Sequence, residues 1–119
     1  MDRETCLEKS FEIVAVGGNA KGMAYEALEV AEAGDFAQAR ELLGASERDL
    51  VEAHKIQTQF IQKSAAGEDI PIDMIFIHAQ DHLMCALEAQ SLIGHLIALQ
   101  EQVTKLEKRL EELEGASHV

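Results

Sequence analysis

A length of 119 residues and a net charge of −12 exclude several classes of protein before any motif is considered. The length is that of one domain, so we expect a single domain over residues 1–119 with a modest core. Acidic side chains outnumber basic ones 22 to 10 and no Lys/Arg cluster is present, which argues against binding to nucleic acid or to an anionic membrane surface.

The first two expected elements are helices over about residues 3–33 and 35–66. Gly34 can close the first helix and Asp35 can cap the second, and no strand alternation appears along the chain. In each segment apolar or small residues recur at steps of three and four, which predicts one buried stripe per helix. The stripes are Ile13, Val16, Ala20, Ala24, Ala27 and Ala31 in the first helix, and Phe36, Ala39, Leu43, Ser46, Leu50, Ala53, Gln57 and Phe60 in the second.

Three glycines lie inside the first predicted helix. Gly17, Gly18 and Gly22 each lower helix propensity by about 1 kcal/mol relative to alanine. We therefore expect them to mark a kink or a close contact with another helix.

A third and longer helix is expected from Pro71 to about Glu114. Its leucines follow the alternating steps of four and three that define a coiled-coil seam: Leu92, Leu96, Leu99, Val103, Leu106, Leu110 and Leu113. A helix of about 43 residues is roughly 65 Å long, whereas partners of about 31 residues reach only about 46 Å. The expected fold is all-α, an antiparallel three-helix bundle whose third helix forms a parallel coiled coil between chains. The alternative is a long helix that packs only on its own bundle.

The chemically unusual residues lie near the start of this third helix. At 100° per residue, His78, Asp81, His82 and Cys85 share one face, and continuing the leucine seam backwards brings polar groups into it. Symmetry-related Asp81 carboxylates on an axis repel one another unless a cation neutralises them. The simpler alternative is a polar layer that only fixes register and oligomeric state.

Two chemistries suit His78. His78 and His82, four residues apart on a helix, have the spacing of a zinc-binding pair, although no third ligand is evident. A neutral imidazole can also accept a phosphoryl group while a neighbouring imidazole or amide steadies the charge. Spacing alone does not choose between the two.

The cysteines and the first residues of the chain indicate a cytoplasmic protein. Cys6 and Cys85 lie far apart and form no C-x-x-C pair, so both are expected to be small buried residues. The chain does not open on a basic segment followed by an apolar run. No stretch reaches the roughly 18 consecutive apolar residues of a membrane span, so we expect no direct membrane insertion.

Several segments resemble the enzyme IIA component of the lactose/cellobiose (chitobiose) class of the bacterial phosphoenolpyruvate-dependent sugar phosphotransferase system. The most specific is Ile-His-Ala-Gln-Asp-His-Leu-Met at residues 77–84, preceded by Glu-Ala-His-Lys-Ile-Gln-Thr-Gln-Phe-Ile-Gln-Lys at 52–63. Residues 18–20 and 33–36 match the first helix and turn of that family. The resemblance covers about residues 10–100.

The resemblance implies a homotrimer of three-helix subunits that carries phosphate. His78 would accept the group from the histidine-containing phosphocarrier protein and pass it to a IIB cysteine. The membrane IIC component would then deliver a phosphorylated β-linked disaccharide inward. The competing hypothesis is a non-enzymatic trimerisation module that only binds a metal.

The resemblance also implies roles for single residues. Asp81 would bind one divalent cation per trimer, Mg²⁺ by expectation, shared by three chains. His82 and Gln80 would stabilise the phosphoryl group, and the alternative for Gln80 is an exposed amide on the helix. His54 and Gln57 belong to the second motif and would line the site or support it, while His95 and His118 match nothing in the family.

Overall fold

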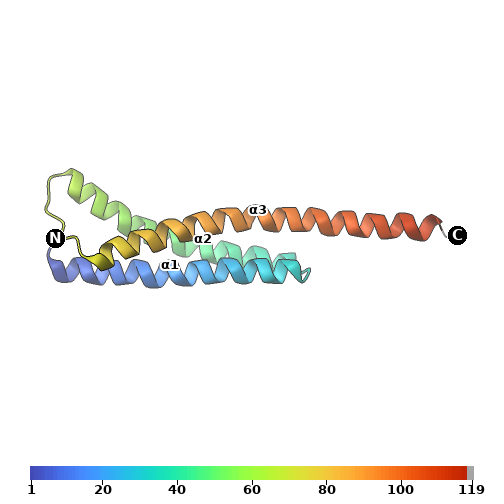
Figure 1. The fold of residues 1–119 in the computed structure, drawn as a ribbon, viewed down its shortest axis with the longest axis horizontal. Coiled ribbons are helices and arrows are strands. Elements are labelled where there is room, and N and C mark those ends of the chain that lie inside the picture. Colours follow the sequence, from blue (N-terminus) through green and yellow to red (C-terminus); the bar gives the residue numbers. More distant parts are fainter. Residues whose placement is uncertain (118–119) are drawn as a thin grey trace.

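The protein is an all-α molecule with a long third helix, and the computed structural model describes residues 1–117. Its helices are α1 (Arg3–Glu32), α2 (Phe36–Ala65) and α3 (Met74–Ser117). In Figure 1, α2 runs back along α1, and α3 then runs beside both and continues far past them. The molecule measures 75 × 21 × 20 Å. The prediction of three helices with a long C-terminal one is confirmed, whereas His118 lies outside the described residues.

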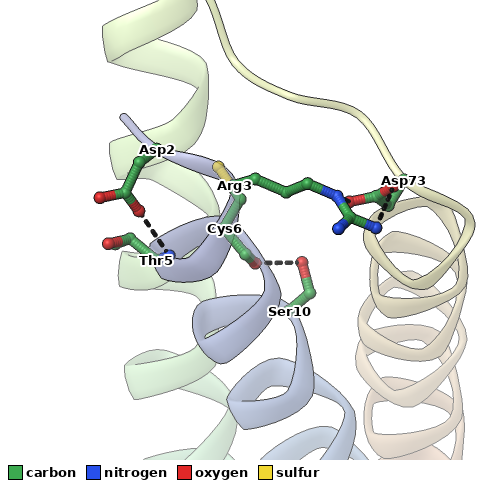
Figure 2. Close-up of polar contacts among 6 residues, drawn as sticks. All are labelled: Asp2, Arg3, Thr5, Cys6, Ser10 and Asp73. Atoms are coloured by element: carbon green, nitrogen blue, oxygen red, sulfur yellow. Dashed lines mark hydrogen bonds and ion pairs between the residues drawn. The ribbon is translucent and has the colours of Figure 1, made fainter.

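The starts of α1 and α2 are fixed by aspartate caps. The Asp2 carboxylate accepts a hydrogen bond from the backbone N–H of Thr5 at 2.8 Å, as Figure 2 shows, and Asp35 accepts one from Gln38 at 3.1 Å. Gly34, between the two helices, has φ +94°, a conformation that side chains with a Cβ rarely adopt. The turn between α1 and α2 therefore depends on the Gly34-Asp35 pair.

The start of α3 differs from the expectation, because the helix begins at Met74 and not at Pro71. The carbonyl of Asp73 accepts the first helical bonds, from the N–H groups of Phe76 and Ile77. The Asp73 carboxylate receives the Arg3 guanidinium at 3.1 and 3.4 Å (Figure 2). Asp73 is thus the residue that starts α3, and its ion pair ties this start to α1.

Small residues let the three helices pack closely. Ala20, Ala24, Ala27 and Ala31 of α1 are fully buried, and Leu83, Ala86, Ile93 and Ile97 are the matching buried residues of α3. A Cβ added at Gly17 would lie 3.9 Å from the Cα of Leu83, so Gly17 marks a close approach of the α1 and α3 backbones. Gly18 and Gly22 have nothing within 4 Å of such a Cβ. The expected close contact is therefore found at Gly17 alone.

One finding differs from the expectation about membrane spans. Over Met74–Ala116, α3 is long and apolar enough to cross a membrane by length and composition alone, with a window of mean hydropathy 1.3. We expected no span because the sequence has no long run of consecutive apolar residues. This window is apolar on average, although it includes scattered polar residues. Such a helix is weak evidence, because core helices of bundles pass the same test. Here Leu83, Ile93 and Ile97 pack on α1 and α2, although only 22% of the apolar window is buried in the single chain.

Candidate functional site

His78 and His82 form a ring pair near the start of α3. Their ring centroids are 4.3 Å apart at an interplanar angle of 64°. His78 is exposed and His82 is half-buried. Ala79 and Leu83, on the core side of the same turns, are fully buried. The core side of this segment is therefore fixed, which keeps the two imidazoles on the outer face and next to each other.

Asp81 and Cys85 lie on the neighbouring strip of that face. The Cys85 thiol donates a weak hydrogen bond to Oδ1 of Asp81 over 3.6 Å, and both residues are exposed. The expectation that both cysteines are buried is thus wrong for Cys85 in the single chain, since its position is on the outer face of α3. It holds for Cys6, which is 2% exposed.

One chain alone does not assemble a metal site in the part that the structure describes. No three His, Cys, Asp or Glu side chains in that part come together in a group able to hold an ion. Asp81 contributes a single exposed carboxylate, the oxygen donor that Mg²⁺ prefers. This donor set fits a divalent cation only if carboxylates from several chains share it.

Gln80 points away from His78. A step of two residues turns the helix by about 200°, so Gln80 leaves α3 on the side of α2. There its Oε1 accepts a hydrogen bond from Nε2 of Gln57 at 2.6 Å. Its own Nε2 is buried without a partner, and it is the only such side-chain nitrogen or oxygen among the described residues. Gln80 therefore cannot touch a group on His78 of its own chain.

The other histidines lie apart from His78. His54 is exposed on α2, where it lines a shallow cavity of about 340 Å³ with Leu87 and Gln90 of α3. His95 is exposed on α3, more than four turns beyond His78. Neither forms part of the His78–His82 pair.

A cavity that sequence reasoning missed lies between α2 and the start of α3. Its volume is about 400 Å³. Its lining residues are Gln57, Phe60, Ile61, Ser64, Ala65, Ile70, Ile72, Phe76 and Gln80. The sequence signal for it is the group of large apolar residues on both sides of Pro71, namely Ile70, Ile72 and Phe76.

Comparison with known proteins shows the family. The model for the lactose/cellobiose-specific IIA subunit of the sugar phosphotransferase system (PTS) matches residues 8–101. The chain belongs to this family. The resemblance seen in the sequence is thereby confirmed, and the part of α3 beyond residue 101 lies outside the matched region.

Two curated relatives agree with this assignment. A lactose-specific EIIA component of Streptococcus mutans is 42% identical over 99 residues, which are 83% of this chain and 95% of the relative. A cellobiose-specific EIIA component of Lactococcus lactis is 38% identical over 97 residues, covering 82% of this chain and 84% of the relative.

Solved structures of other IIA proteins share the fold. The cellobiose-specific enzyme IIA of Bacillus anthracis matches with a TM-score of 0.82 and 35% identity, covering 88% of this chain and 94% of that one. The chitobiose IIA of Escherichia coli, solved in complex with HPr, matches with a TM-score of 0.73 and 35% identity, over 83% of this chain and 96% of that one.

Proposed function

We propose that this IIA subunit is a cytoplasmic phosphoryl carrier in which His78 holds the phosphate. The supporting observation is the exposed imidazole of His78 on a fixed turn of α3, with the His82 ring 4.3 Å away. A carrier has to present its group to the surfaces of other proteins, and an exposed side chain does this. The family and the HPr complex of the chitobiose relative support HPr, the histidine-containing phosphocarrier protein, as the donor.

The transfer is an exchange between nucleophiles. A ring nitrogen of His78, taken as Nε2 because it reaches furthest from the helix, attacks the phosphorus of the donor phosphohistidine. The new N–P bond forms while the donor N–P bond breaks, and the donor imidazole leaves. A thiolate of the IIB component then attacks the same phosphorus and releases the His78 imidazole. His82 donates a hydrogen bond to a phosphoryl oxygen while His78 is loaded.

The proposed working form is a homotrimer with the three α3 helices parallel around an axis. Its support is the row of exposed apolar residues along one face of α3, from Leu92 at 54% to Leu113 at 55%. These residues keep the heptad spacing. Because Gln80 faces away from His78 of its own chain, any contact of Gln80 with the phosphoryl group has to come from the partner's Gln80. The site is then completed between chains.

Asp81 lies on the side of α3 that would face the axis. In the trimer three Asp81 carboxylates would hold one divalent cation, with Mg²⁺ as the expected ion. The ion would supply positive charge that offsets the repulsion among the carboxylates. Its role is structural, and the transfer at His78 requires only the imidazoles and the partner proteins.

In this scheme the IIB component passes the phosphate on, and the membrane IIC component delivers a phosphorylated β-linked disaccharide. The names of the relatives, lactose- and cellobiose-specific, support this substrate class. A non-enzymatic, metal-binding trimerisation module is the remaining alternative. It needs the Asp81 layer but has no use for an exposed His78 beside His82.

The test is phosphorylation by phosphoenolpyruvate, enzyme I and HPr. The parent protein should gain an acid-labile, base-stable phosphate, as expected of a phosphohistidine. His78→Ala should gain none, whereas the matched variant His95→Ala, an exposed histidine of the same helix, should behave as the parent does. If His78→Ala accepts phosphate as fast as the parent, the carrier assignment at His78 is wrong. If the parent accepts none, the module alternative is favoured.

A further inference from the structure

Cys85 takes no part in the proposed phosphoryl transfer, although it is an exposed cysteine on α3. Free cysteine is among the residue types most often found buried, so an exposed one indicates a surface that becomes covered or a thiol that binds something. Its Sγ lies 3.6 Å from Oδ1 of Asp81, one turn earlier in the helix. A soft sulfur donor and a hard oxygen donor therefore lie together on this face.

The separation between these two atoms is that of two ligands on one metal ion. Zn²⁺ binds thiolate sulfur at about 2.3 Å and carboxylate oxygen at about 2.0–2.2 Å. At a tetrahedral angle two such ligands lie about 3.6 Å apart, whereas at the right angle of an octahedral site they lie about 3.1 Å apart. The observed 3.6 Å between Sγ and Oδ1 thus matches tetrahedral coordination without any movement of the helix.

Both residues lie on the strip of α3 that would face the trimer axis. At 100° per residue, Asp81 and Cys85 lie about 20° on either side of Leu92, the first leucine of the exposed apolar row. His82 lies about 80° from the same line. Within the described residues no third His, Cys, Asp or Glu of the same chain joins the pair. The site is therefore incomplete in one chain, and other copies on the same axis have to supply the remaining donors.

Three-fold symmetry would supply those donors. In the proposed trimer the Asp81–Cys85 pair occurs three times around the axis, which gives more donors than the four that zinc usually takes. The Cys85 layer lies between the Asp81 layer and the apolar Leu92 layer, so leucines close the site on one side and limit the access of water. Thiolate is a soft ligand that favours Zn²⁺ over Mg²⁺, whose preferred donors are oxygens.

We infer that the axial ion of this protein is a thiophilic divalent cation of the zinc class, bound jointly by Asp81 and Cys85 of the three chains. The inference rests on the trimer and the Asp81 ion of the proposed function, and it replaces the Mg²⁺ expected there. When the ion binds, a metal–sulfur bond forms, the S–H bond breaks and the proton passes to water, with no change of oxidation state. The transfer at His78 needs none of these atoms.

The first experiment loads the full-length protein, with its thiols reduced, with Co²⁺ as a coloured substitute for Zn²⁺. The parent should show a thiolate-to-cobalt charge-transfer band that saturates at one ion for three chains. Cys85→Ser should lack this band. The matched variant Cys6→Ala, which removes the buried thiol of α1, should keep it.

A competition titration against a chromophoric chelator measures the selectivity. Zn²⁺ should bind Cys85→Ser at least about tenfold more weakly than the parent, because even the outer-shell partners of a bound metal are worth roughly 10- to 100-fold in affinity. Mg²⁺ should bind the two proteins alike. The ratio of Zn²⁺ affinity to Mg²⁺ affinity therefore falls in the variant.

Equal Zn²⁺ affinity in Cys85→Ser and the parent would overturn the inference, and so would a parent without the sulfur band. In either case Mg²⁺ that is bound by the parent and lost in Asp81→Asn still supports the proposed axial ion. If the parent binds neither Zn²⁺ nor Mg²⁺, the inference and the proposed ion are both wrong, whereas phosphate on His78 still supports the carrier assignment. The failures are thereby distinguishable.

Discussion

The side chain of Cys6 in α1 is buried. Its side chain is 2% exposed, and the hydroxyl of Ser10, itself buried, donates to its backbone carbonyl at 2.7 Å (Figure 2). Burial raises the pKa of the Cys6 thiol above its ordinary value; the N-terminal ammonium opposes this shift, and the carboxylates of Asp2, Asp73 and Glu68 add to it. The reactive thiolate is therefore disfavoured in the folded chain.

This environment predicts that Cys6 reacts only when α1 opens. In a Cys85→Ser background, alkylation of Cys6 by iodoacetamide at pH 8 should be at least about 100-fold slower in native buffer than in denaturant. Equal rates in the two conditions would contradict the buried position. The same raised pKa means that the free energy of unfolding falls as pH rises above 9.0, because the unfolded chain then ionises before the folded one does.

Contacts within one helix could be predicted from the sequence, and contacts between helices could not. His78 and His82 are four residues apart, so helix geometry alone places their rings side by side. The bond between Gln57 and Gln80 depends on how far α2 is shifted along α3, which no local pattern specifies. The direction of Gln80 follows from the 100° step, but its partner and its unpaired Nε2 do not.

At the scale of the helices, one glycine inside α1 and one in the turn after it differ in what a substitution would do to stability. Gly22 lies inside the helix with open space where a Cβ would be, whereas Gly34 holds φ +94° in the turn. The same chemical change should therefore have opposite effects at the two positions.

We expect Gly22→Ala to stabilise the protein by roughly 1 kcal/mol, since alanine favours the helix and meets no neighbour. Gly34→Ala should destabilise it by about 1 kcal/mol or more, because alanine at positive φ is strained. Denaturant unfolding followed by circular dichroism measures both. A loss of stability in Gly22→Ala would show that another surface packs against this position.

The helix ends show which local sequence signals are sufficient to predict where a helix begins or ends. Gly34 and Asp35 fix a turn by their own conformational preferences and by side-chain capping, so the sequence is enough there. Pro71 is compatible with a first helical turn but does not require one. The start of α3 is set instead by Asp73, whose carboxylate is held by Arg3 from α1, a contact between residues distant in the sequence.

At the scale of the whole molecule, the protein is far from spherical. Its radius of gyration is 20.2 Å, against about 13 Å for a compact domain of about 100 residues. The difference comes from the part of α3 that extends past α1 and α2 (Figure 1). Its apolar row stays exposed, with Leu106 at 67% and Leu110 at 56%. This part lies outside the region that matches the family.

We predict that this extension, and not the Asp81 layer, holds the chains together. Leu106→Asp combined with Leu110→Asp should lower the mass in light scattering from that of the proposed homotrimer towards the 13.1 kDa of one chain. Lys108→Asp, which makes the same change in net charge on the other side of the helix, should keep the parent mass. Asp81→Asn should lose the proposed cation and also keep that mass. Loss of the trimer in Asp81→Asn alone would assign assembly to the metal.

The order of the helices along the chain has a consequence for biosynthesis. Synthesis begins at the N-terminus, so α1, α2 and the part of α3 that packs on them leave the ribosome before the extension does. The segments that form the bundle therefore emerge before the surface proposed for joining other chains. This order favours folding within the chain ahead of association, which would disfavour exchanged helices in the proposed homotrimer.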